Sequence, residues 1–121
     1  MSRVVHFEIP ANDTQRCESF YHQVFGWNFQ KWDGPMEYWM VSTGSAARGI
    51  DGGMMKRQAP EQGVVNTIEV ESLDAVVKKV LGQGGQVTVP RSAIPGIGWI
   101  AYCTDTEANL FGVLEPDESA K

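Results

Sequence analysis

The sequence predicts an α+β fold built from two modules, each with the order strand, helix, strand, strand, strand. Apolar residues repeat every second position in the expected strands and every third or fourth position in the two expected helices. Displacing the chain by 60 residues superimposes Val4 on Val64, Trp39 on Trp99 and Gly52 on Gly112. One helix covers only one face of a four-stranded sheet. We therefore expect the modules to pair into a curved mixed sheet, with helices outside and a cup inside.

The first strand carries the main chemical signal. Val5, Phe7 and Ile9 alternate with His6 and Glu8. A strand sends alternate side chains to opposite faces, so the ionisable pair is expected on the face away from the helix. The strand is predicted to end at the following proline, Pro10, which cannot donate to a ladder.

The first helix is predicted to begin at Asn12–Thr14, whose side-chain oxygens can accept hydrogen bonds from free helix N–H groups. It is expected to end at Gly26. An apolar stripe follows the helical period and is predicted to pack on the apolar face of the first strand; its members are Cys17, Phe20, Tyr21 and Val24.

The remaining elements follow from turn residues and alternation. Strands of the first module are predicted at Trp27–Asp33, Glu37–Thr43 and Ile50–Lys56. In the second module, strands are predicted at Val64–Val70, Gln86–Val89, Trp99–Thr104 and Asn109–Glu115. Its helix is expected to be capped by Ser72, with an apolar stripe of Leu73, Val76, Val77 and Val80.

Length and composition indicate one domain of 121 residues, with modules at about 1–57 and 63–116 and a linker at 58–62. The net charge of −5 argues against nucleic acid as a partner. No apolar run is long enough to span a membrane, and the N-terminus lacks a signal-peptide core, so we expect a cytoplasmic protein. Cys17 and Cys103 are expected to be free, buried thiols.

Several motifs carry a resemblance to a known family. His6 precedes the stretch FYHQVFGW, VESLDAV opens the second half, and IPGIGWIAYCTDTEANLFGVLE closes it. The chain resembles the vicinal-oxygen-chelate superfamily, which includes glyoxalases, bleomycin-resistance proteins and extradiol dioxygenases, and is most similar to its small glyoxalase-related branch. The resemblance implies the two-module fold and a homodimer.

The resemblance also implies four positions from which metal-dependent members hold a divalent ion. They correspond to His6, Gly52, Val65 and Gly112 in this sequence. The third position falls on Val65 or Asn66, and alternation favours Val65. Glycine and valine offer no side-chain donor, and a catalytic zinc site needs about three. We therefore expect no metal and no other cofactor.

The cup is predicted to be lined by residues from both modules. The expected ligand-binding residues are His6, Glu8, Gly52, Met54, Val65, Thr67, Glu69 and Gly112. His6 is either a general base or a residue retained by hydrogen bonding, and Glu69 lies either in the cup or at its rim. The aromatic residues are ligand-stacking platforms, core or dimer interface; they are Trp32, Tyr38, Trp39, Trp99 and Tyr102.

These observations predict a homodimer that binds a small organic ligand in an apolar cup, without metal, as bleomycin-resistance proteins sequester a drug. The alternative is an isomerase or lyase in which His6 moves a proton and Glu8 or Glu69 orients it. A metal-dependent form of that enzyme would need an atypical ligand set of His6, Glu8 and Glu69. A partner-binding module, which would expose an apolar patch, is a third possibility.

Overall fold

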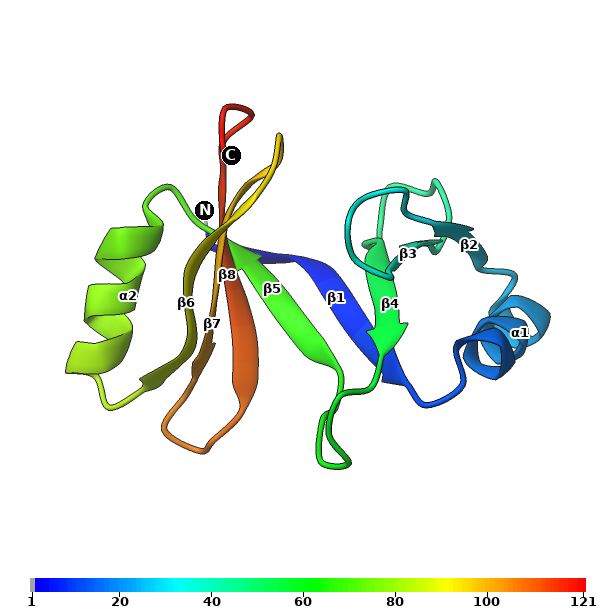
Figure 1. Ribbon diagram of the computed structural model, residues 1–121, viewed down its shortest axis with the longest axis horizontal. Helices are drawn as coiled ribbons and strands as arrows, with labels where there is room; N and C mark the ends of the chain where they lie inside the picture. Colours follow the sequence, from blue (N-terminus) through cyan, green and yellow to red (C-terminus); the bar gives the residue numbers. More distant parts are fainter. Residues whose placement is uncertain (1) are drawn as a thin grey trace. The chain divides into compact units, whose positions relative to one another are not determined.

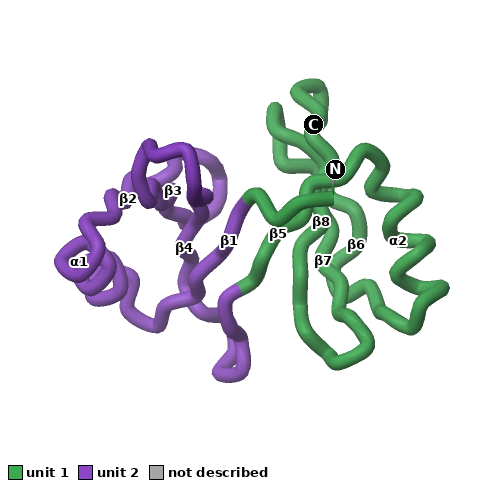
Figure 2. Tube along the Cα trace, turned by 180° about the vertical axis from the view of Figure 1, so that it is seen from behind, with its two compact units in different colours: residues 1–5, 65–121 green, residues 6–64 purple. Residues whose placement is uncertain are grey.

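The computed structural model describes residues 2–121, which form two helices and eight strands in the predicted order. The α+β class is confirmed. The chain divides into two compact units, residues 1–5 with 65–121 (unit 1) and residues 6–64 (unit 2) (Figure 2). Each unit holds one helix and a four-stranded mixed sheet (Figure 1).

Unit 2 carries the first helix and most of the first strand. Its elements are β1 (Arg3–Ala11, starting in unit 1), α1 (Thr14–Phe25), β2 (Asn28–Lys31), β3 (Trp39–Ser42) and β4 (Gly52–Lys56). The strands lie in the order β2-β3-β4-β1. β1 is parallel to β4, and the other two pairs are antiparallel.

Unit 1 repeats this arrangement. Its elements are β5 (Val65–Glu69), α2 (Leu73–Gly82), β6 (Gln86–Ile94), β7 (Gly98–Thr104) and β8 (Leu110–Pro116). The strands lie in the order β5-β8-β7-β6, with β5 parallel to β8. Ser72 caps α2 by accepting a hydrogen bond from the Ala75 N–H at 3.2 Å, as predicted. Leu73 then packs into a cluster with Val70, Ala101 and Val113, so α2 covers one face of this sheet.

Helix α1 is placed differently from the prediction. Asp13 is its N-cap, and Gly26 ends it with a left-handed backbone at φ 76°. Only half of the predicted apolar stripe is turned away from solvent, because Phe20 and Val24 are 56% and 54% exposed. Trp27 explains the difference: its ring stacks on Tyr21 with centroids 4.9 Å apart.

The same aromatic group reaches the sheet. The Trp27 ring lies 5.8 Å from the Phe7 ring, and both belong to the cluster that includes Cys17. Trp27 therefore packs on Phe7, a contact that was predicted for the apolar stripe of α1.

Two prolines lie inside strands rather than at their ends. Pro10 lies within β1, where its carbonyl accepts a hydrogen bond from the Arg57 guanidinium. Pro90 lies within β6, which runs on to Ile94 and pairs with β7 through two register shifts. Bulged pairing of β6 tolerates Pro90, which has no N–H, whereas Pro10 lies opposite Met55 in a regular pairing one residue before the end of β1. The predicted strand ends at these prolines were therefore wrong.

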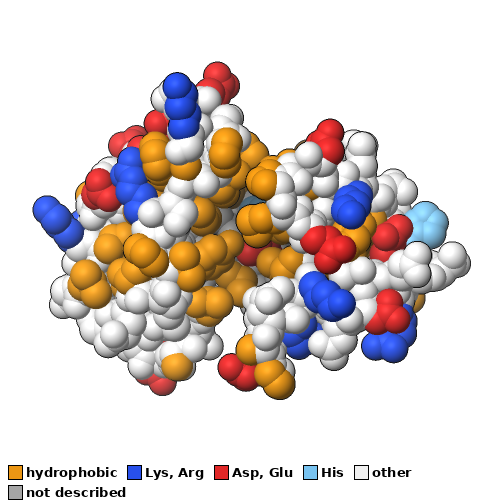
Figure 3. Space-filling view, viewed as in Figure 1, with side chains coloured by type: hydrophobic (Ala, Val, Ile, Leu, Met, Phe, Trp, Pro, Cys, Tyr) orange, Lys and Arg blue, Asp and Glu red, His pale blue; other side chains and the backbone are white. Residues whose placement is uncertain are grey.

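The surface of unit 1 displays apolar side chains over α2 and β6 (Figure 3). Leu81 of α2 is 54% exposed and Val89 of β6 is 43% exposed. Within residues 2–121, neither helix has the length and apolar character needed to cross a membrane.

Candidate functional site

The site develops on the face of the unit 2 sheet that α1 does not cover. Phe7 packs on the α1 side, so strand alternation turns His6 and Glu8 to the opposite, open face. In the parallel pairing of β1 with β4, Phe7 is opposite Gly52 and Glu8 is opposite Gly53. Gly53 therefore lies beside Glu8 on the open face.

Three side chains on this face form a hydrogen-bonded chain. The Nε2 atom of His6 lies 2.8 Å from the Tyr38 hydroxyl oxygen, and this hydroxyl donates to Oε2 of Glu8 at 3.1 Å. All three side chains are half-buried. Tyr38 comes directly before β3 and shares the face of Met40, which is opposite Gly53.

The charge on His6 is set by two opposing effects. Burial lowers the pKa of His6 below its ordinary value of 6.5, and it outweighs the Glu8 and Asp51 carboxylates, which raise that pKa. His6 is therefore neutral at pH 7. Asp51 is held in place because its Oδ1 accepts a hydrogen bond from the Thr43 N–H at 2.9 Å.

A hollow of about 450 Å³ opens beside His6, within unit 2. Side chains from four strands or their ends contribute to it; they include His6, Asn28, Gln30, Met40, Ser42 and Asp51. A neutral imidazole at such a hollow can accept a hydrogen bond from a ligand or take a proton from one.

Two predicted ligand-binding residues lie on the wrong face for this site. Met54 is fully buried in the cluster with Ala11 and Val41, on the α1 side of the sheet, so its predicted place in the cup was wrong. A Cβ on Gly52 would point the same way, 2.5 Å from the Phe7 ring. Gly52 therefore contributes only backbone to the hollow.

The error concerns which face of β4 each residue occupies. Two adjacent glycines carry no hydrophobic pattern, so the sequence alone could not say which of them faces His6. The pairing of β1 with β4 assigns the open face to Gly53 and Met55, opposite Glu8 and Pro10.

The predicted site residues of the second module share one face of unit 1. Ile68 packs against the α2 cluster, so Val65, Thr67 and Glu69 turn to the other face, as alternation indicated over the choice of Asn66. Thr67 pairs with Gly112, and a Cβ on Gly112 would lie 3.1 Å from the Thr67 hydroxyl. That these residues join His6 and Glu8 in one cup stays a prediction, as does the place of Glu69 in the cup or at its rim.

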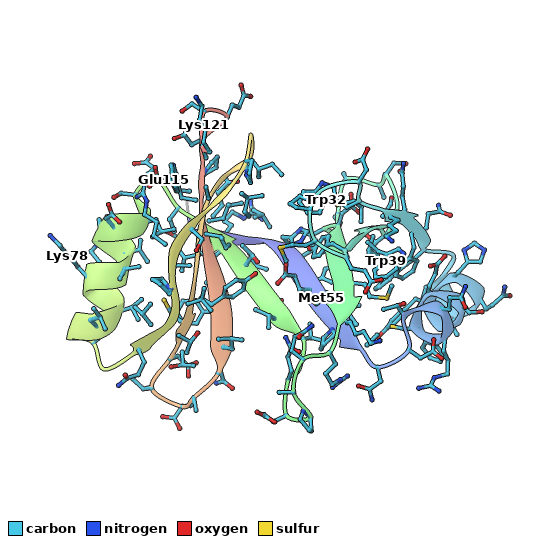
Figure 4. The ribbon with its side chains drawn as sticks, in the orientation of Figure 1. Trp32, Trp39, Met55, Lys78, Glu115 and Lys121 are labelled. Atoms are coloured by element: carbon cyan, nitrogen blue, oxygen red, sulfur yellow. The ribbon has the colours of Figure 1, made fainter. Side chains whose placement is uncertain are left out.

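Of the five aromatic residues considered, two lie in the core and one lies in the site. Trp39 and Trp99 pack against the clusters of their own units. Figure 4 shows Trp39 on the α1 side of the unit 2 sheet. Tyr38 was considered for ligand stacking, the core or a dimer interface, and its hydrogen bonds to His6 and Glu8 were missed. The available signal was its spacing of two from Met40, which places it on the same face of the strand.

The residues of unit 2 do not fit the divalent ion of the metal-dependent proteins. The Nε2 atom of His6 is hydrogen-bonded to the Tyr38 hydroxyl, and Oδ1 of Asp51 is hydrogen-bonded to the Thr43 N–H. Gly53 has no side chain that could bind a metal. Within residues 2–121, no group of three His, Cys, Asp or Glu side chains is arranged to hold a metal. Zinc sites need about three such ligands.

Comparison with known sequences gives consistent matches. A family model for the N-terminal part of bleomycin-resistance-like proteins matches residues 3–44, a stretch that contains His6, Glu8 and Tyr38. A glyoxylase-like domain-containing protein of Didymella fabae is 31% identical over 112 residues, which cover 88% of each chain. CFP32 of Mycobacterium bovis, which carries a glyoxylase name, is 32% identical over 117 residues; the match covers 89% of this chain and only 43% of CFP32.

Comparison with solved structures supports the fold. The crystal structure of methylmalonyl-CoA epimerase from Mycobacterium tuberculosis matches with a TM-score of 0.70 and 15% sequence identity. The match covers 94% of this chain and 87% of the epimerase. At this identity, the likeness concerns the fold alone.

Proposed function

Because the chain belongs to the vicinal-oxygen-chelate superfamily, in its glyoxalase-like group, we propose that it binds a small organic molecule in the hollow beside His6. The binding does not use the divalent ion of the metal-dependent members. A homodimer and a cytoplasmic location belong to the same proposal, and sedimentation velocity and cell fractionation test them.

The observation that carries this proposal is His6 at the wall of the hollow, held by its hydrogen bond to Tyr38, which in turn donates to Glu8. Apolar and amide side chains supply the rest of the wall, among them Met40 and Gln30. Sites for small molecules combine such a largely apolar surface with a few polar groups that fix the orientation of the ligand. His6 is the polar group best placed to do so.

Thermal-shift screening against a metabolite library tests the binding. A ligand at 100 times its dissociation constant adds about 2.7 kcal/mol to the free energy of unfolding, which raises the melting temperature measurably. The His6→Ala variant is expected to lose this increase. His22→Ala is the matched control, because His22 is exposed on α1 and does not line the hollow. Equal increases in both variants would place the ligand elsewhere and contradict the proposal.

A second candidate function is proton transfer by His6 in an isomerase or epimerase. It is favoured by the neutral state of His6 and by its link through Tyr38 to the Glu8 carboxylate, which can stabilise the charged imidazolium. The name of the structural neighbour, methylmalonyl-CoA epimerase, also indicates chemistry of this kind for that protein.

Hydrogen exchange tests the second candidate. In deuterated buffer, an acid–base His6 is expected to catalyse exchange of the acidic C–H proton next to the carbonyl of a bound thioester or ketone. Proton NMR follows this exchange. His6→Ala is expected to remove the exchange, and His22→Ala to leave it unchanged. Ligand binding without exchange would support sequestration in place of catalysis.

A further inference from the structure

Tyr38 reaches His6 only because residue 53 is a glycine. A Cβ built on Gly53 would overlap the hydroxyl end of Tyr38. The ring end of Tyr38 therefore lies directly over the Gly53 backbone, where its hydroxyl meets both His6 and Glu8. Any larger residue at position 53 would displace the tyrosine from this position.

The protons in the hydrogen bonds between His6, Tyr38 and Glu8 can be assigned one by one. A tyrosine hydroxyl has one proton, and Tyr38 donates it to the Glu8 carboxylate. The Tyr38 oxygen must then accept from Nε2 of His6, so Nε2 carries a proton. A neutral imidazole has only one N–H, which leaves Nδ1 as an acceptor with an available lone pair. Within residues 2–121, Nδ1 of His6 makes no hydrogen bond.

The charged groups of residues 2–121 that act on His6 have one sign. They are the carboxylates of Glu8 and Asp51. Among the described residues, no lysine or arginine lines the hollow. A carboxylate or phosphate ligand in the hollow would meet an acceptor nitrogen and the Asp51 carboxylate, which is unfavourable on both counts.

We propose that the ligand at this site is a neutral or cationic molecule that presents an N–H or O–H donor to Nδ1 of His6, and that Tyr38 is the positioning residue that imposes this preference. The inference rests on the proposed function, because it concerns the same hollow. It adds the chemical class of the ligand and the residue that selects it.

The first experiment determines which ring nitrogen of His6 carries the proton. A long-range proton–nitrogen NMR spectrum of the ¹⁵N-labelled protein at neutral pH distinguishes a protonated from an unprotonated ring nitrogen. The wild-type protein is expected to show His6 with the proton on Nε2. Tyr38→Phe is expected to give a mixture of the two tautomers. Tyr21→Phe is the matched control, because the Tyr21 hydroxyl makes no hydrogen bond within residues 2–121.

The second experiment uses five fragments that share a phenyl ring: benzylamine, benzyl alcohol, benzamide, benzoate and phenyl phosphate. Their effect on the His6 ring signals is followed by titration. The three fragments with a donor are expected to shift these signals at a concentration at least about tenfold lower than the two anions. Tyr38→Phe is expected to reduce this difference, and Tyr21→Phe to preserve it.

Each outcome has one meaning. A wild-type proton on Nδ1, an unchanged tautomer in Tyr38→Phe, or preferential binding of benzoate or phenyl phosphate would overturn the inference. His6-dependent binding of an anion would do so while leaving the proposed function intact. If no fragment perturbs His6 and no library compound stabilises the protein, the proposed function fails, and the tautomer spectra still decide the role of Tyr38.

Discussion

At the scale of single residues, burial controls the chemistry of His6. Two carboxylates favour its protonated form, yet desolvation has the larger effect and lowers its pKa. The Tyr38 hydroxyl gives the neutral ring a hydrogen-bond partner in place of water. The result is a histidine available as an acceptor at pH 7, which both candidate functions require.

This pKa predicts how stability depends on pH. Below the ordinary value of 6.5, the unfolded chain takes up a proton at His6 while the folded protein still leaves this residue neutral. The unfolded state therefore binds more protons, and the folded protein loses stability as the pH falls through this range. Relative to His6→Gln, the wild type is expected to show a declining free energy of unfolding between about pH 7 and about pH 5.

Urea denaturation of both proteins at each pH measures this difference. A wild type that gains stability over His6→Gln on acidification would mean that the carboxylates outweigh burial. His22→Gln controls for the general effect of removing a histidine, because His22 is exposed.

At the scale of helices and strands, the two helices contribute unequally to the core. α2 places Leu73, 1% exposed, at the centre of its cluster, whereas no residue of α1 is fully buried. Apolar burial is the main favourable term in folding, so α2 and the strands it covers are expected to dominate the stability of unit 1.

A pair of leucine substitutions on α2 tests this. Leu73→Ala is expected to cost about 2–5 kcal/mol, because it removes a fully buried side chain and leaves a cavity. Leu81→Ala on the same helix is expected to stay within about 0.5 kcal/mol of the wild type. Chemical denaturation measures both. Similar losses in the two variants would contradict the assignment of Leu73 to the core and of Leu81, 54% exposed, to the surface.

At the scale of the whole molecule, the two modules have the family's order of helices and strands, and the resemblance assigns three of its four metal positions to residues without a donor side chain. Those three positions correspond to Gly52, Val65 and Gly112. In unit 2, Tyr38 has taken the Nε2 atom of His6 as its hydrogen-bond partner. We therefore expect polar chemistry without a metal on the family fold.

Chelation and elemental analysis test this at the same scale. Protein purified without chelator is expected to carry far less than one divalent ion per chain, and EDTA is expected to leave its melting temperature unchanged. A metal that binds only the folded state would add stability, so its removal would lower the melting temperature. A stoichiometric ion that is lost in His6→Ala would contradict the metal-free site.

The order of the strands and helices followed from the sequence because its signals are local. Alternation, helical period, the cap at Ser72 and the stop at Gly26 each depend on a few neighbouring residues. The placement of His6 and Glu8 on one face of β1 was predictable for the same reason.

Only the tertiary structure decided which glycine of β4 faces His6, how α1 lies on its sheet, and that Tyr38 joins His6 to Glu8. The glycine assignment and the contacts of Tyr38 depend on pairing between segments about 30 or more residues apart, and the place of α1 depends on the contact of Trp27 with Phe7. A one-residue change of register reverses every side chain of a strand, and adjacent glycines carry no pattern that selects the register. Packing of Met54 against Val41 selects it, by burying one face of β4 and leaving the other to the site.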